Sequence, residues 1–303
     1  MDVSIILVNY NTKELTSQTI ESIIKYSQNF SYEIILIDNN SLDGSKQLFE
    51  NDSRIRFISS ETNLGFGRAN NLAATFAKGE FLFLLNTDTI LLNNAIYYFL
   101  EFYKTNSKNK NIGVLGCVLY DSYNNEILSH IPFKSIPQYL KLFNQLFSQK
   151  IFKTKPKPIT QNLDLSEFNV EAVLGADMFL RRDLFEEVGG FDKSFFLYGE
   201  ETELQKRIVL KGFNNYIIRT PKIIHLEGGS VGKANKRLTP FTVLQLKIGD
   251  LIFIKKHYSN IYFKLYVFLQ LFTWLPFIHI DKRFNKIDRK MALNILFNFK
   301  KVI

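Results

Sequence analysis

The sequence predicts an α/β protein with a doubly wound, mainly parallel sheet, and two observations support this prediction. Short apolar runs alternate with helical patterns through the first third of the 303-residue chain. Such alternation is typical of parallel strands joined by crossover helices. Polar side chains also follow three of the apolar runs, as they do where the carboxyl ends of parallel strands form a ligand site.

Four strands and three helices are expected in this part of the chain. The Asn-Thr-Lys-Glu sequence that begins at Asn11 predicts the N-cap of the first helix, because glutamate is common at the third helical position. The sequence from Ser41 to Gly44 leads into the second helix in the same way. The expected strands are residues 3–8, 33–37, 55–59 and 81–85, and the second and third helices are 46–50 and 67–77.

Composition limits the class of protein. With 46% hydrophobic and 22% charged residues, the chain can bury a sizeable core and is too apolar to be disordered. Cys117 is the only cysteine, so an internal disulfide or a cysteine-based zinc site is excluded, and a reducing compartment fits. The N-terminus is expected to enter a core strand directly, because no basic segment precedes its first apolar run as it would in a signal peptide.

The net charge of +9 is unevenly distributed. Residues 1–232 contain 24 Lys and Arg against 26 Asp and Glu, whereas residues 233–303 contain 14 against 3. Within the basic part, residues 261–280 include seven aromatic side chains and one charge, Lys264, and Pro276 interrupts the run. The uncharged stretch, 265–280, has 16 residues, fewer than the roughly 20 that a spanning helix needs. It predicts a helix that lies at a membrane surface, and a helix packed on the core is the alternative.

The segment 130–165 departs from the alternation of strand and helix. Its apolar residues have helical spacing, and lysines surround them. We expect an insertion that could cover a bound ligand or touch lipid head groups, although ordinary helix packing explains the pattern as well. Residues 154–158, which include two prolines, are expected to be a flexible stretch. The apolar residues of the helical pattern are Tyr139, Leu142, Phe143, Leu146 and Phe147.

Polar residues after three strands predict a nucleotide site. They are 9–11, 38–41 and 86–88, and in a parallel sheet they would share one edge, although any one group could simply form a turn. The glycine-rich loops of dinucleotide-binding and P-loop enzymes do not follow the first strand. A diphosphate would then need another counter-charge, and a divalent cation held by Asp88 supplies it, because hard cations prefer oxygen ligands.

A second acidic cluster begins a later helix. Glu200, Glu201 and Glu203 follow the Phe-Phe-Leu-Tyr-Gly sequence at 195–199. A carboxylate here could accept a proton in catalysis. The alternative is that these side chains only stabilise the helix N-terminus.

Taken in order, seven segments resemble family 2 glycosyltransferases, particularly the rhamnosyltransferase-like branch. The similarity runs from about residue 3 to residue 230. It implies a GT-A fold at 1–232, with a Rossmann-like nucleotide-binding half and an acceptor half, followed by a helical extension at 233–303. The segments are 3–11, 37–45, 63–71, 85–89, 174–182, 188–192 and 195–204.

The resemblance also implies site roles. Asp38 would contact the base, Asn9 and Tyr10 would line its pocket, and Arg68 would lie near the base or diphosphate. Asn86, Thr87 and Asp88 would face the donor, with Asp88 at the D-x-D position as ligand of Mn²⁺ or Mg²⁺ and Asn86 replacing the first aspartate. His225, in the segment 222–230, would join the metal. Asp177, Glu200 and Glu203 would lie on the acceptor side, and the insertion at 130–165 would lie beside it.

Glu201 would be the catalytic base. Relatives usually carry Glu-Asp-x-Asp-Leu at this place, whereas this chain reads Glu-Glu-Thr-Glu-Leu at 200–204. The longer side chain would move the carboxylate by about 1 Å, a shift that catalysis can feel. The chain therefore departs from the pattern at its proposed base.

The function implied is inverting, metal-dependent sugar transfer in bacterial cell-surface polysaccharide synthesis. The donor would be dTDP-rhamnose, with UDP-sugars second and GDP-sugars third, and the acceptor a lipid-linked glycan. The enzyme would be cytoplasmic and peripheral at the inner membrane face, and its apolar tail could instead pair two chains. An inactive GT-A-like nucleotide-sugar-binding or scaffold protein is the alternative. A nucleic-acid partner is not expected despite the pI of about 9.3, because the basic residues lie in an apolar tail.

Overall fold

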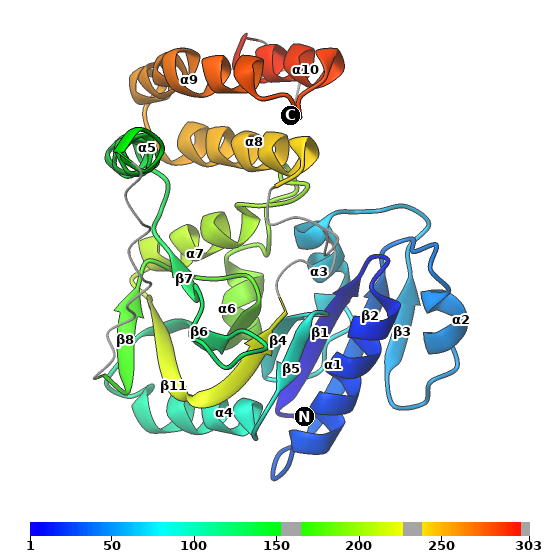
Figure 1. Ribbon diagram of the computed structural model, residues 1–303. Coiled ribbons are helices and arrows are strands. Elements are labelled where there is room, and N and C mark those ends of the chain that lie inside the picture. Colours follow the sequence, from blue (N-terminus) through cyan, green and yellow to red (C-terminus); the bar gives the residue numbers. More distant parts are fainter. Residues whose placement is uncertain (153–164, 227–237, 298–303) are drawn as a thin grey trace. The chain divides into compact units, whose positions relative to one another are not determined.

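The computed structural model describes residues 1–152, 165–226 and 238–297 (Figure 1). These residues form two compact units. The first contains residues 1–132, 165–193 and 201–226, and the second contains 133–152, 194–200 and 238–297. The first half of the expected insertion therefore belongs to the same unit as the C-terminal helices. The expected flexible stretch at 154–158 and the residues after Leu226 in the histidine segment lie outside the described residues.

A mixed, mainly parallel sheet forms the centre of the first unit. The strand order among the described residues is β3-β2-β1-β4-β10-β6-β11-β5, with β8 paired to β11. The first four strands are parallel, and β10 is antiparallel to both β4 and β6. This confirms the predicted fold class. The strands are β1 (Val3–Asn9), β2 (Tyr32–Asp38), β3 (Arg56–Ser59), β4 (Phe81–Asn86), β5 (Thr89–Leu91), β6 (Ile112–Tyr120), β8 (Glu167–Val170), β10 (Asp177–Arg181) and β11 (Asn214–His225), and the short strands β7 (His130–Ile131) and β9 (Ala172–Val173) pair with each other.

Helices cover both faces of this sheet (Figure 1). Because side chains alternate along a strand, Ile5 belongs to the core on one face and Ile6 to the core on the other. Helices α1 and α4 contribute to the first core, and α3, α6 and α7 to the second. The helices are α1 (Lys13–Tyr26), α2 (Ser45–Phe49), α3 (Phe66–Ala74), α4 (Ala95–Asn106), α6 (Arg182–Glu187) and α7 (Glu200–Leu210).

The predicted N-cap of the first helix is wrong. Helix α1 begins at Lys13 with Thr12 at the cap position, and no side chain caps it. Asn11 instead has a positive φ of 55°, and its Oδ1 accepts a hydrogen bond from the backbone N–H of Leu42 at 2.7 Å. The first N–H of the helix donates to Oδ2 of Asp43 at 2.8 Å. Long-range hydrogen bonds from the loop after β2 therefore replaced the local cap.

The second unit consists of helices. Threonine and serine N-caps begin two of them, since Oγ1 of Thr239 accepts from the N–H of Thr242 and Oγ of Ser259 accepts from the N–H of Tyr262. The helical spacing predicted from Tyr139 onwards is confirmed by α5. The helices are α5 (Ile136–Phe152), α8 (Pro240–His257), α9 (Asn260–Ile280) and α10 (Lys286–Phe297). By length and composition alone, α9 could cross a membrane, and 22% of its most apolar window is buried.

Candidate active site

The ends of β1 and β2 are joined by side-chain hydrogen bonds. Nδ2 of Asn9 donates to Oδ1 of Asp38 at 2.7 Å and to Oγ of Ser41 at 3.0 Å. Oδ1 of Asn9 accepts from the hydroxyls of Thr12 and Thr16 at 2.8 and 2.9 Å. Asn9 is fully buried, so in this structure it positions Asp38 instead of lining a surface. Tyr10, the next residue, is 42% exposed.

The loop after β4 is fixed from two sides. Oγ1 of Thr19 in α1 lies 2.9 and 2.8 Å from the backbone carbonyl oxygens of Thr87 and Thr89, and its one hydrogen is shared between these two acceptors. On the other side, the N–H of Asn86 donates to the carbonyl of Ala176 at 3.0 Å, just before β10. Because its backbone is bonded to both neighbours, this loop holds Asp88 in a defined position.

Asp88 and His225 come together at this edge. Oδ1 of Asp88 lies 3.2 Å from Nε2 of His225, and their side chains are only 10% and 11% exposed. The antiparallel pairing of β11 with β5 sets His225 opposite Thr89, and the N–H of Leu226 donates to the carbonyl of Asp88 at 2.9 Å. Two residues far apart in the sequence therefore present an oxygen and a nitrogen ligand side by side.

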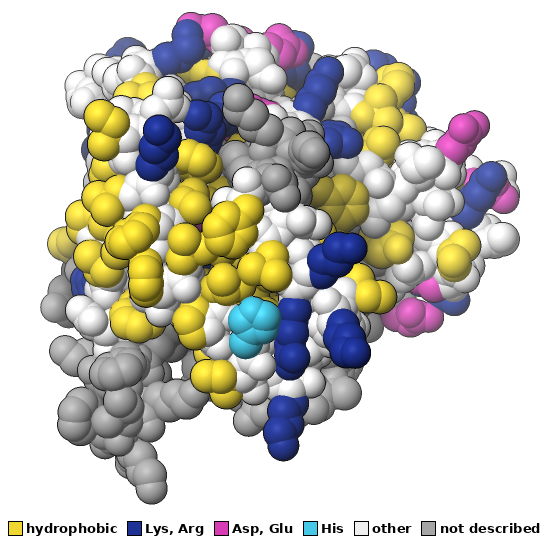
Figure 2. All heavy atoms as spheres, turned by 90° about the horizontal axis from the view of Figure 1, so that it is seen from above, with side chains coloured by type: hydrophobic (Ala, Val, Ile, Leu, Met, Phe, Trp, Pro, Cys, Tyr) yellow, Lys and Arg dark blue, Asp and Glu magenta, His cyan; other side chains and the backbone are white. Residues whose placement is uncertain are grey.

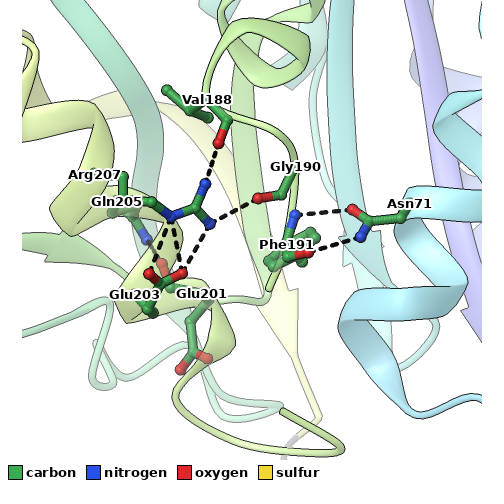
Figure 3. A network of polar contacts seen from close by, with 8 residues as sticks. All are labelled: Asn71, Val188, Gly190, Phe191, Glu201, Glu203, Gln205 and Arg207. Carbon is green, nitrogen blue, oxygen red and sulfur yellow. Dashed lines mark hydrogen bonds and ion pairs between the residues drawn. The ribbon is translucent and has the colours of Figure 1, made fainter. Parts of the chain in front are cut away.

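Glu201 lies beside the same region. It is the second residue of α7, and its side chain packs on Gly175. A Cβ added to Gly175 would lie 3.4 Å from Cγ of Glu201. Gly175 directly precedes Ala176, which is bonded to Asn86. The half-buried Glu201 carboxylate points away from the polar network around Arg207 (Figure 3). A single short segment therefore connects Glu201 to the end of β4.

The neighbouring Glu203 has a different environment. It is fully buried, and Arg207 binds both of its oxygens at 2.7 to 3.0 Å. The same guanidinium donates to the carbonyls of Val188 and Gly190 (Figure 3). Glu203 therefore anchors α7 to the loop at 188–191.

A match to a family model covers residues 4–189, and its description is glycosyl transferase family 2. The chain belongs to glycosyl transferase family 2. Relatives include the O-antigen biosynthesis protein RfbC of Myxococcus xanthus, 26% identical over 75% of this chain and 17% of that protein. The rhamnosyltransferase WbbL of Escherichia coli K12 is 26% identical over 74% of this chain and 83% of that protein.

Two further similarities are a sequence match over a shorter segment of the chain and a match of the fold to a solved structure. The Escherichia coli protein WfgD, a UDP-Glc:α-D-GlcNAc-diphosphoundecaprenol β-1,3-glucosyltransferase, is 33% identical over 31% of this chain and 38% of its own length. The structure of GalNAc-T7 with UDP, GalNAc and Mn²⁺ superposes over all of this chain and 56% of that one, with a TM-score of 0.62 and 16% identity. The chain spans 17% and 32% of the lengths of the first two curated relatives that it matches.

The side chains of Asp88 and His225 in this family 2 chain fit a divalent metal. Carboxylate oxygen and imidazole nitrogen both suit Mn²⁺, and Asp88 and His225 supply one of each within 3.2 Å. Among the described residues, no group of three or more His, Cys, Asp or Glu side chains is arranged to hold a metal. Asp88 and His225 are therefore the residues that would hold such an ion.

Two further predicted residues, Arg68 and Glu200, have environments of their own. Arg68 is exposed on α3, and its Nε donates to the carbonyl of Lys193 at 2.9 Å. Glu200 is 2% exposed and belongs to the second unit. The loop before it is tightly confined within that unit, because a Cβ on Gly249 of α8 would lie 2.2 Å from the carbonyl oxygen of Tyr198.

Sequence reasoning missed two residues that shape the site. Asn71 donates to the carbonyl of Phe191 and accepts from its N–H, both at 2.8 Å (Figure 3). Arg207 fixes α7 as described above. Its spacing of four residues from Glu203 is the local signal that could have indicated this pair. No local pattern indicates the contact of Asn71, because its partner lies far along the chain.

Asp177 is fully buried at the start of β10, and its Oδ2 accepts from the N–H of Cys117 at 2.6 Å. Its acceptor-side role stays a prediction. Burial raises the pKa of Asp177 from 3.8 to about 7. The folded protein therefore binds one more proton than the unfolded chain between about pH 4 and pH 7. Its free energy of unfolding falls across that range, and the cost is fully present above pH 7.

We expect Asp177→Asn to raise the melting temperature at pH 8 and to change it little at pH 4, in buffer with EDTA. Asparagine keeps an acceptor for the Cys117 N–H and removes the buried charge, whose cost is on the order of 4 kcal/mol at most. Asp183→Asn is the control, because that side chain is 63% exposed. An equal gain from Asp177→Asn at both pH values would contradict the expected ionisation.

Proposed function

We propose that this family 2 chain is an inverting glycosyltransferase that moves a sugar from a nucleoside-diphosphate sugar to a hydroxyl of a glycan acceptor. The observation that carries the proposal is the contact of Asp88 with His225 at the carboxyl edge of the sheet. Asp38, held by Asn9, lies along the same edge two strands away. Ligands of open α/β sheets bind at such edges, so a nucleotide and its diphosphate have matching groups here.

Glu201 is the proposed base. In a single displacement, the acceptor oxygen bonds to the anomeric carbon, the bond from that carbon to the diphosphate breaks, and the nucleoside diphosphate leaves with the electron pair. Glu201 takes the proton of the acceptor hydroxyl. The burial of Glu203 and of Glu200 supports this choice among the three glutamates. When bound by Asp88 and His225, Mn²⁺ or Mg²⁺ would offset the charge that develops on the departing diphosphate.

The finer assignment concerns the substrates. Similarity to WbbL, a rhamnosyltransferase, supports rhamnose as the sugar. The choice of dTDP as its carrier, ahead of UDP-sugars, rests on the resemblance of the sequence motifs to the rhamnosyltransferase-like branch. Similarity to WfgD supports an acceptor linked to a lipid diphosphate. Together with the match to RfbC, these relatives support a role in the synthesis of a cell-surface polysaccharide.

Thermal stability with nucleotides tests the donor site. We expect dTDP to raise the melting temperature of the wild type only when Mn²⁺ is present, and UDP and GDP to raise it less. A ligand at about 100 times its dissociation constant adds roughly 2.7 kcal/mol to the free energy of unfolding. Asp88→Ala should lose the metal-dependent shift, because it removes the carboxylate that would hold the ion together with His225.

Asp183→Ala is the matched control, because it removes an exposed aspartate outside the proposed site. It should keep the full shift. If UDP or GDP gave the largest shift, the dTDP assignment would be wrong while the transferase proposal stood. If no nucleotide stabilised the protein in the presence of Mn²⁺, the chain would be better described as an inactive protein with a GT-A-like fold, the alternative suggested by the departures at Asn86 and Glu201.

A further inference from the structure

Helix α9 is apolar on its outward side as well as on its inward side. Its outward stripe is apolar, and its side chains are 49% to 81% exposed. The residues of its inward stripe are spaced four apart along the chain. They include Gln270 and Trp274, whose polar groups are buried. A helix at a protein surface normally turns its apolar side to the core. The outward residues are Ile261, Leu265, Phe268 and Phe272, and the inward ones are Tyr266, Gln270, Trp274 and Ile278.

A charged cluster lies beneath the inward stripe. Nζ of Lys134 is 3.0 Å from Oδ1 of Asp250, and the hydroxyl of Tyr266 donates to Oδ2 of Asp250 at 3.5 Å. Lys247, whose side chain is 9% exposed, lies 5.4 Å from the ring centroid of Trp274. Because α9 covers this cluster, its inward face is committed to contacts inside the second unit.

These contacts argue against a spanning arrangement of α9. A helix that crosses a bilayer alone would carry its inward polar groups into hydrocarbon, where each unsatisfied group is costly. The hydroxyls of Tyr139 in α5 and Thr273 in α9 form a further hydrogen bond that holds α9 in the unit. Only the outward stripe is therefore available to an apolar phase.

Positive charge surrounds the stripe. Residues 255–297 contain eight Lys and Arg and only two Asp, and Lys264, Lys282, Lys286 and Lys290 are exposed. Ile287 of α10 is 77% exposed among them. Figure 2, which looks onto α9 and α10, shows hydrophobic side chains gathered beside Lys and Arg. Two copies of this surface would repel each other, whereas an anionic membrane would attract it.

We propose that the outward stripe of α9 and the lysines around it form a docking surface for an anionic bilayer, on which α9 lies in the plane of the interface. Phenylalanine rings enter the boundary between head groups and acyl chains, and the lysines contact anionic head groups. The surface would place the second unit at the leaflet where a lipid-linked acceptor is found. The inference does not rest on the proposed transferase activity.

Sedimentation with vesicles tests the surface without nucleotide or acceptor. The full chain should sediment with vesicles of equimolar phosphatidylcholine and phosphatidylglycerol, less with phosphatidylcholine alone, and less again at high salt. Phe268→Ser with Phe272→Ser should weaken binding by at least about tenfold, because two exposed rings no longer leave water. Alkaline carbonate should release the bound protein.

The matched control is Tyr123→Ser with Leu210→Ser, which removes two exposed apolar side chains, 84% and 67% accessible, from the first unit. It should bind vesicles like the wild type. Circular dichroism would show that both double variants fold. The proposal is overturned if the wild type stays in the supernatant, if both double variants bind equally, or if carbonate fails to release the protein, which would indicate a spanning helix. A wild-type dimer that the phenylalanine variant dissociates, without vesicle binding, would assign the stripe to a second copy.

Discussion

Glu201→Gln should lower the rate of sugar transfer by about 10²- to 10⁴-fold, the usual contribution of a general base. Glutamine keeps the shape and the packing on Gly175 but cannot take the acceptor proton. Nucleotide binding should be unchanged, because Asp38, Asp88 and His225 are intact. Release of the nucleoside diphosphate, measured at saturating donor over a range of pH, checks the rate. The thermal shift with dTDP and Mn²⁺ checks the binding.

Two comparisons make this experiment specific. Glu187→Gln changes a glutamate whose side chain is 59% exposed, and it should leave the rate unchanged. Glu201→Asp keeps a carboxylate at this position, so it should keep far more activity than Glu201→Gln. Its rate should still fall at low pH, where the carboxylate becomes protonated. Full activity of Glu201→Gln would show that another group takes the proton.

Arg207→Met should lower the free energy of unfolding by about 3–5 kcal/mol, as is typical when one partner of a buried ion pair is removed. Glu203 is fully buried and would keep an uncompensated charge. The carbonyls of Val188 and Gly190 would also lose their donor. Urea unfolding followed by circular dichroism measures the loss.

Lys211→Met is the control for Arg207→Met. Lys211 pairs with Glu187 on the surface, where the two side chains are 42% and 59% exposed, and such pairs contribute about 0–1 kcal/mol. The double change Glu203→Met and Arg207→Met should recover part of the lost stability, because the buried charge is gone. It should not recover all of it, because the two carbonyls stay without Arg207. A loss no larger than that of Lys211→Met would mean that water reaches Glu203 and replaces the guanidinium.

The sequence by itself determined the alternating elements of the first unit. Each end of the four predicted strands lies within one residue of the observed end, because apolar runs of strand length are local signals. It also determined which polar residues follow β1, β2 and β4, and the ordered motifs indicated the family. Helix ends were less certain. The third helix ends at Ala74, three residues before the predicted end, and the cap at Asn11 was lost to a long-range bond with Leu42.

Only the tertiary structure decided which of these residues meet and which are buried. His225 reaches Asp88 because β11 pairs with β5, a register that no local pattern specifies. The three glutamates of α7 look alike in sequence, yet the packing of Arg207 buries Glu203 and leaves Glu201 half-exposed. The sequence also could not predict which side of α9 is buried, because a helix that is apolar all round does not reveal which stripe faces inward. Periodicity is a property of one segment, whereas burial and proximity depend on the segments packed against it.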